Sequence, residues 1–159
     1  MPGANTVAIK KVGVIGAGQM GSGIAHVVAL AGYDVLLTDI SKEVVDKAMA
    51  TIARNMDRQI ARGLITEADK QAALGRIQYA ADYDAFSDCD LVIEAATENE
   101  SIKRQIFTEL TPKLKPEAII ASNTSSISIT RLASITKRPE RFIGMHFMNH
   151  VQVMQLVEL

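Results

Sequence analysis

Three polar side chains near the end of the sequence are suited to proton transfer. Imidazole exchanges protons near neutral pH, so His146 is a candidate general base, although a single histidine among apolar residues is more often structural. Glu158 lies twelve residues later and would orient the imidazole if the two segments form neighbouring strands. Ser125 lies in a serine-rich turn, where its hydroxyl would either cap a helix or hydrogen-bond a reacting oxygen. These residues form the candidate catalytic group.

A glycine pattern near the start of the chain is suited to binding a pyrophosphate. Gly16, Gly18 and Gly21 fit the pattern G-x-G-x-x-G, with Gln19 and Met20 between the last two glycines. The first glycine permits a tight turn, the second lets backbone approach a phosphate, and the third lets a helix pack closely on the preceding strand. Alone, such a pattern is weak evidence, because most glycine turns are only structural.

The segments around the glycines agree with a dinucleotide site. The apolar run Lys11–Ile15 predicts a buried strand, and residues 19–31 have helical spacing of apolar side chains. The N–H groups at the start of that helix would point at the phosphates. The glycine pattern follows the first strand without a gap, Gly32 ends the helix, and a second strand is predicted at 35–37.

Asp39 predicts which dinucleotide binds. It closes the second strand, 18 residues after Gly21. A carboxylate at this position accepts hydrogen bonds from a ribose 2′-OH and repels a 2′-phosphate. The next residues, Ile40 and Ser41, bring no arginine that would bind such a phosphate. We therefore expect NAD rather than NADP.

The rest of the chain alternates between predicted helices and strands. We expect helices at 41–62, 66–75 and 99–114, a helical turn at 82–87, and strands at 77–79, 91–96, 118–121, 141–147 and 153–159. This alternation predicts an α/β fold of the Rossmann type: a doubly wound, mainly parallel sheet with helices on both faces, in the strand order 3-2-1-4-5-6. Ligands of such sheets bind at the carboxyl ends of strands, where Glu98, Ser125 and His146 all occur.

The helix predicted at 41–62 carries a basic face. Arg54, Arg58 and Arg62 recur every four residues, so they share one side of the helix. A solvated basic edge is the simpler interpretation, and a phosphate-bearing substrate is the alternative.

Composition limits the remaining possibilities. The chain has 159 residues, 48% of them hydrophobic and 22% charged, with a net charge of −1, which predicts one globular domain with no nucleic-acid or membrane surface. Cys89 is the only cysteine, so we expect an inert thiol, no internal disulfide and no metal site. No segment has the character of a secretion signal or membrane span, and we expect a cytoplasmic location.

Three motifs resemble the 3-hydroxyacyl-CoA dehydrogenases, nearest to their bacterial 3-hydroxybutyryl-CoA branch. They are GAGQMGSGIA at 16–25, SNTSS at 122–126 and GMHFMN at 144–149. The resemblance covers nearly the whole chain and is to the N-terminal NAD-binding domain of the family. We therefore expect residues 1–159 to be that domain alone, without the helical domain that dimerises and covers the substrate.

The resemblance implies roles for the candidate catalytic group. His146 matches the base that takes the proton of the 3-hydroxyl as hydride leaves for the nicotinamide. Glu158 matches the acid that orients this histidine, and Ser125 matches a residue that contacts both substrate and cofactor.

The resemblance also implies binding residues. Glu98, Lys103 and Asn149 match further NAD contacts, while Asn55 and Arg62 match coenzyme A contacts. The face that includes Arg54 thereby becomes a candidate for binding coenzyme A phosphates. One departure is that His150 and Gln152 replace the two prolines of the family's usual Asn-Pro-x-Pro. We interpret His150 as a substitution and not as a second catalytic base.

The function expected from this resemblance is reversible, NAD-dependent oxidation of an (S)-3-hydroxyacyl-CoA to the 3-oxoacyl-CoA. One alternative is a 3-hydroxyacid dehydrogenase that acts on a free acid, a class in which a lysine on a later helix replaces the histidine–glutamate pair. Another is an NAD-binding module without catalysis. Without the helical domain, we expect this chain to bind NAD, to catalyse poorly and to associate into a homo-oligomer.

Overall fold

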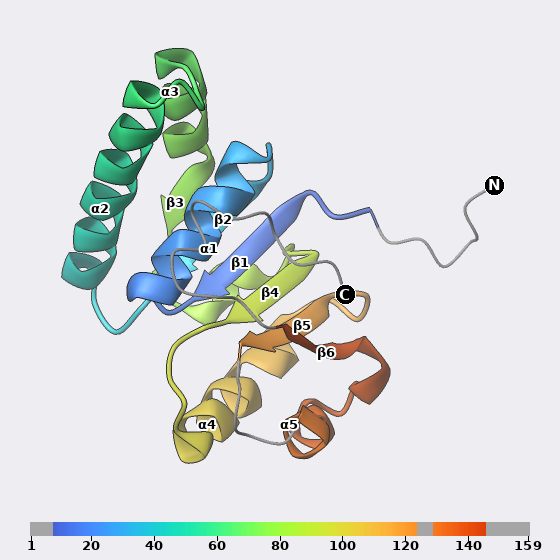
Figure 1. Ribbon diagram of the computed structural model, residues 1–159. Coiled ribbons are helices and arrows are strands. Elements are labelled where there is room, and N and C mark those ends of the chain that lie inside the picture. Colours follow the sequence, from blue (N-terminus) through green and yellow to red (C-terminus); the bar gives the residue numbers. More distant parts are fainter. Residues whose placement is uncertain (1–7, 124–128, 146–159) are drawn as a thin grey trace.

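Six strands form one sheet in the computed structural model, which describes residues 8–123 and 129–145 (Figure 1). Every strand pair within these residues is parallel, and the order is β3-β2-β1-β4-β5-β6, which confirms the predicted topology. The strands are β1 (Lys11–Ile15), β2 (Asp34–Thr38), β3 (Ile77–Tyr79), β4 (Leu91–Glu94), β5 (Ile119–Asn123) and β6 (Phe142–Met145).

Helices connect successive strands and cover both faces of the sheet (Figure 1). One face packs against α1, α2 and α3, and the other packs against α4, α5 and a 3₁₀ turn, η1. The elements are α1 (Gln19–Leu30), α2 (Lys42–Ala61), α3 (Glu67–Arg76), η1 (Tyr83–Phe86), α4 (Glu100–Leu110), η2 (Thr111–Lys113), α5 (Ile129–Thr136) and η3 (Pro139–Arg141).

Two apolar clusters, one on each face, make up the core. Successive residues of a strand point to opposite faces, so Val35 and Leu37 enter the cluster under α1 and α2, whereas Leu36 enters the cluster under α4. Both faces are covered, which explains why the strands read as continuous apolar runs. Gly13 leaves room for the buried ring of Phe86, because a Cβ there would lie 2.6 Å from a ring carbon.

The register of the sheet aligns the carboxyl ends of its central strands. Ile15 at the end of β1 pairs with Thr38 of β2 on one side and with Glu94 of β4 on the other. Glu94 in turn pairs with Ser122 of β5. The glycine turn after β1 and the loops after β2, β4 and β5 therefore leave the sheet along the same edge.

Predicted element ends differ from the observed ends where side chains or proline intervene. The strand expected at 91–96 ends at Glu94, because the carboxylate of Glu94 accepts the N–H of Ala96 at 2.8 Å. The helix expected at 99–114 ends at Leu110 and continues as η2, which contains Pro112, a residue without an N–H to donate. The strand predicted at 153–159 lies outside the described residues.

Candidate functional site

The glycine turn adopts a geometry that its first and third glycines make possible. Gly16 has φ of 107°, and its N–H donates to the carbonyl of Thr38 at 2.9 Å. A Cβ on Gly16 would lie 2.7 Å from the backbone of Ala95. A Cβ on Gly21 would lie 1.7 Å from the carbonyl oxygen of Gly16, so larger residues are excluded where α1 packs on the turn.

The second glycine leaves open space at the start of α1. A Cβ built on Gly18 meets no protein atom within 4 Å, and Gly18 is the N-cap of α1, where no side chain caps the helix. The first turn of α1 contains no acidic residue, Gln19 is exposed and Met20 is half-buried. This combination suits an anion, because the first N–H groups of a helix carry partial positive charge and lack partners within the helix. The predicted phosphate contacts at 16–21 therefore lie together and fit a dinucleotide.

Asp39 joins the end of β2 to the glycine turn. One carboxylate oxygen accepts the N–H of Ala17 at 2.6 Å, and the other accepts the N–H of Ile40 at 2.6 Å. These two bonds fix the half-buried carboxylate beside the turn. Each oxygen retains a lone pair, so Asp39 has the position and the acceptor capacity to bind a ribose hydroxyl.

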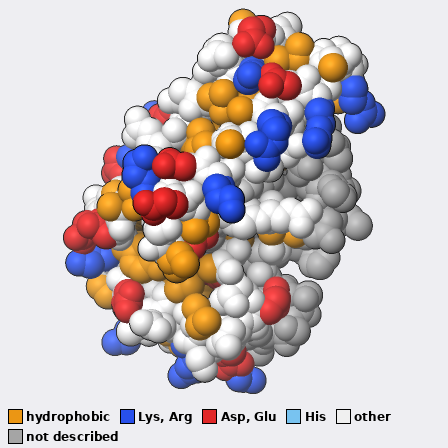
Figure 2. Space-filling model, turned by 90° about the vertical axis from the view of Figure 1, so that its left-hand side faces the viewer, with side chains coloured by type: hydrophobic (Ala, Val, Ile, Leu, Met, Phe, Trp, Pro, Cys, Tyr) orange, Lys and Arg blue, Asp and Glu red, His pale blue; other side chains and the backbone are white. Residues whose placement is uncertain are grey.

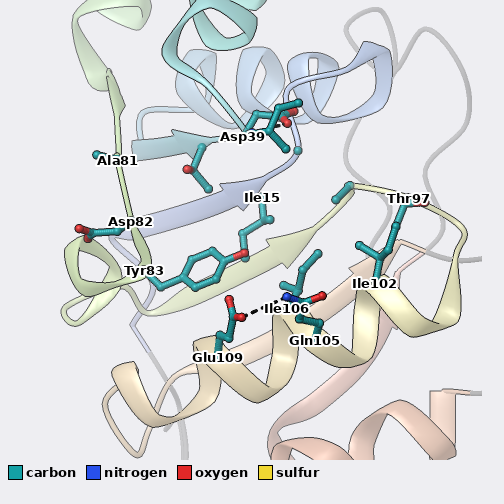
Figure 3. A pocket seen from close by; sticks show the side chains of 14 residues that line it. Ile15, Asp39, Ala81, Asp82, Tyr83, Thr97, Ile102, Gln105, Ile106 and Glu109 are labelled. Carbon is teal, nitrogen blue, oxygen red and sulfur yellow. Dashed lines mark hydrogen bonds between the residues drawn. The ribbon is translucent and has the colours of Figure 1, made fainter.

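A cavity of about 680 Å³ opens beside Asp39 (Figure 3). The loops after β1, β2, β3 and β4 form its rim, and one side of α4 forms its wall. Its lining residues are Ile15, Gly16, Thr38, Asp39, Ile40, Ala81, Asp82, Tyr83, Ala96, Thr97, Ile102, Gln105, Ile106 and Glu109. The cavity continues from the glycine turn past Asp39, as a site for the adenosine half of a dinucleotide requires.

A buried charged network lies at the same edge of the sheet. Glu94 and Lys103 are both fully buried and form an ion pair. Ser122 donates its hydroxyl to the Glu94 carboxylate at 2.6 Å, and Lys103 Nζ also lies 3.4 Å from the carbonyl oxygen of Asn123. This network joins α4 to the ends of β4 and β5.

Sequence reasoning named Lys103 as an NAD contact but missed its partners Glu94 and Ser122. The available signal was a carboxylate closing the apolar run of β4, since a charged residue is almost never fully buried unless it is paired. Glu98, another predicted NAD contact, is exposed in the loop between β4 and α4.

A second cavity, of about 600 Å³, lies between the start of α1 and α2. Asn55 and Arg58 line it together with Lys47 and Thr51. Arg54 and Arg62 are exposed and are not among the described residues that line it. The predicted arginine face is thus divided, and Arg58, which donates to the amide oxygen of Asn55 at 3.2 Å, is its member at the cavity. In the face that Figure 2 shows, Lys and Arg side chains are more frequent in the upper half of the molecule, which is the half that contains α2 in Figure 1.

Two buried side chains with reactive groups are structural. Burial raises the pKa of Cys89 to about 12, so the thiol stays protonated and inert, as predicted. His26 on α1 is fully buried, and burial lowers its pKa, although a 2.7 Å hydrogen bond to the side chain of Gln59 opposes the shift. Neutral His26 therefore helps to join α1 to α2.

The predicted catalytic group falls outside the residues that the structure describes. Ser125, His146 and Glu158 all do so, and so does the predicted NAD contact Asn149. Across residues 8–123 and 129–145, no group of three or more His, Cys, Asp or Glu side chains could hold a metal ion. In the same segments, no helix is long and apolar enough to cross a membrane.

The parallel doubly wound sheet, the glycine turn and the acid after β2 define a dinucleotide-binding domain. Comparison with known proteins identifies the family to which this dinucleotide-binding domain belongs. Residues 11–159 match the family described as 3-hydroxyacyl-CoA dehydrogenase, NAD binding domain, and the chain belongs to that family.

Similar proteins carry related names. A 3-hydroxybutyryl-CoA dehydrogenase of Bradyrhizobium diazoefficiens is 63% identical over 151 residues, which cover 95% of this chain and 52% of that protein. A probable 3-hydroxybutyryl-CoA dehydrogenase of Deinococcus radiodurans is 50% identical, over 94% of this chain and 53% of its own length. The crystal structure of the (S)-3-hydroxybutyryl-CoA dehydrogenase from Ralstonia eutropha superposes with a TM-score of 0.90 at 50% identity, over 92% of this chain and 52% of that one. The chain thus spans about half the length of these relatives.

Proposed function

We propose that this chain is the cofactor-binding part of an enzyme that reversibly oxidises an (S)-3-hydroxyacyl-CoA, with 3-hydroxybutyryl-CoA as the expected substrate. The observation that carries the proposal is the arrangement of the open Gly18 turn and the fixed Asp39 carboxylate beside one cavity. The names of the relatives described above supply the substrate class.

The described residues would bind NAD in three places. The N–H groups at the start of α1 would bind the diphosphate, Asp39 would accept from the adenosine ribose, and the cavity beyond Asp39 would hold the base. NAD would supply the hydride acceptor. Glu98, Lys103 and Asn149 remain proposed contacts nearer the nicotinamide.

The proposed chemistry uses the candidate catalytic group identified in the sequence. His146 would take the proton of the 3-hydroxyl, and Glu158 would stabilise the resulting imidazolium. Ser125 would hydrogen-bond the oxygen that becomes the carbonyl. Asn55, Arg54, Arg58 and Arg62 are the proposed contacts for coenzyme A, with Arg58 and Asn55 favoured because they line the second cavity.

Two measurements test the proposal. Titration of the chain with NADH, followed by the fluorescence of the reduced nicotinamide, should show tighter binding than titration with NADPH, and Asp39→Ala should narrow that difference. Acetoacetyl-CoA, and not acetoacetate, should then support slow oxidation of bound NADH. Oxidation driven by acetoacetate would instead identify a dehydrogenase of free acids, and NADH binding without turnover of either compound would identify a binding module.

The proposal includes a cytoplasmic location and a homo-oligomeric state. Both rest on the sequence and on the family resemblance. Cell fractionation tests the first, and sedimentation equilibrium of the purified chain tests the second, where a monomer at all concentrations would be the contrary result.

A further inference from the structure

The cavity next to Asp39 determines the direction in which a bound dinucleotide would extend. The inference drawn from that direction rests on the function proposed above. With the diphosphate at the glycine turn and the ribose at Asp39, the base must extend away from the turn, toward α4 and the loop after β3. Ile40 and Ile102, which are 93% and 47% exposed, are among the residues that line the cavity. A flat heterocycle would cover both apolar side chains, which explains why large hydrophobic residues are exposed there.

The far wall of the cavity is polar. Gln105 and Glu109 lie one turn apart on α4, and the Gln105 amide donates to the Glu109 carboxylate at 3.3 Å (Figure 3). With the amide N–H₂ directed at Glu109, the Gln105 carbonyl oxygen and the second Glu109 oxygen remain as acceptors. The wall thus presents hydrogen-bond acceptors to whatever edge of the base reaches it.

The charged side chains that line the cavity, among the described residues, are all acidic. Asp39, Asp82 and Glu109 are among its lining residues, whereas no lysine, arginine or histidine is among the lining residues that the structure describes. Tyr83 lies between these groups, and burial, together with the carboxylate of Glu109, raises the pKa of its hydroxyl. Such a cavity favours a ligand edge that donates hydrogen bonds and disfavours one that carries a carbonyl.

We propose that Gln105 and Glu109 recognise the 6-amino group of adenine and thereby select an adenine dinucleotide over its 6-oxo analogue. The 6-amino group offers two N–H donors, and each acceptor of the pair would take one. Replacing that group by an oxygen would place a carbonyl against the Glu109 carboxylate, with repulsion in place of a hydrogen bond. The apolar walls bind either base, so the selection depends on the pair.

The experiment compares binding of NADH with that of reduced nicotinamide hypoxanthine dinucleotide, which carries the 6-oxo group. Fluorescence titration of the unaltered chain should show a preference for NADH of at least about tenfold, which is the effect of the hydrogen bond to the partly solvated Glu109 carboxylate alone. Glu109→Ala and Gln105→Ala should each reduce the preference while leaving NADH binding measurable. Both residues are exposed, so neither variant should disturb the fold.

Glu117→Gln is the matched control, because Glu117 is an exposed carboxylate before β5, outside the lining of this cavity, and the preference should persist in it. Equal affinity of the unaltered chain for the two dinucleotides, or an undiminished preference in Glu109→Ala, would overturn the inference and leave the proposed function standing. A chain that binds neither dinucleotide would instead overturn the proposed function, and this inference with it.

Discussion

Replacing Lys103 by methionine should strongly destabilise the domain. Its ammonium is the only cation that the structure places against Glu94 within the described residues, and both side chains are 0% exposed. Lys103→Met would leave a buried carboxylate whose partners, among the described residues, are the Ser122 hydroxyl and the Ala96 N–H. Breaking a buried ion pair in this way costs about 3–5 kcal/mol. That loss is a large share of the roughly 5–15 kcal/mol that stabilises a typical domain.

Urea unfolding followed by far-ultraviolet circular dichroism measures the effect. With a slope of roughly 1–3 kcal/mol per molar urea, the midpoint should fall by about 1–5 M while the slope stays constant. The surface variant Lys42→Met is the matched control, because its ion pair with Asp46 is about 60% exposed on each side. That variant should change the free energy of unfolding by less than about 1 kcal/mol.

A double variant separates loss of the pair from loss of packing. Lys103→Met combined with Glu94→Leu removes both charges, and it should recover more than half of the stability lost in Lys103→Met alone. The reasoning would be refuted if Lys103→Met unfolded at the same urea concentration as the unaltered chain. It would also be refuted if the double variant were less stable than the single one.

Three further expectations address the turn, the second cavity and acid stability. Gly21→Ala should abolish NADH binding and lower the thermal midpoint, because its Cβ would overlap the carbonyl of Gly16; normal affinity would contradict this. Arg58→Ala should weaken acetoacetyl-CoA binding about tenfold, and Arg62→Ala should do so less, as calorimetry would show. Burial of the Asp90 carboxyl opposes ionisation, but hydrogen bonds from Lys115 and the backbone lower its pKa from 3.8 to about 2. Asp90 should therefore stabilise the fold above pH 4 and lose that effect as pH falls toward 2, and Asp90→Asn should flatten this part of the pH profile.

The topology could be predicted because local pattern and sheet geometry agree. Apolar runs, the glycine turn and helix starts such as Thr66, which forms a capping box with Asp69, are all local signals. Right-handed crossovers then leave few arrangements for alternating strands and helices. The position of Asp39 beside the glycine turn follows directly, since β1 and β2 are neighbours.

Side-chain partners between distant segments could not be predicted in the same way. Glu94 meets Ser122 across 28 residues and Lys103 across 9, and only the register of β4 and β5 with α4 places the three together. Helical spacing showed that Arg54, Arg58 and Arg62 share a face, but the docking of α2 on α1 decides that Arg58 lines a cavity. Periodicity shows toward which face of its own helix or strand a side chain points. It does not show which side chain of another element lies against it.

Because the start of α1 has no side-chain cap, a bound cofactor would contribute to the free energy of unfolding of the domain. The helices α2, α3 and α4 each begin with a side-chain cap, supplied by Ser41, Thr66 and Asn99, whereas the N-cap of α1 is Gly18. A bound diphosphate would act as the missing capping group. By mass action, a dinucleotide at a hundred times its dissociation constant would add about 2.7 kcal/mol to the free energy of unfolding. The lifetime of this domain against proteolysis would then rise and fall with the supply of the molecule that it binds.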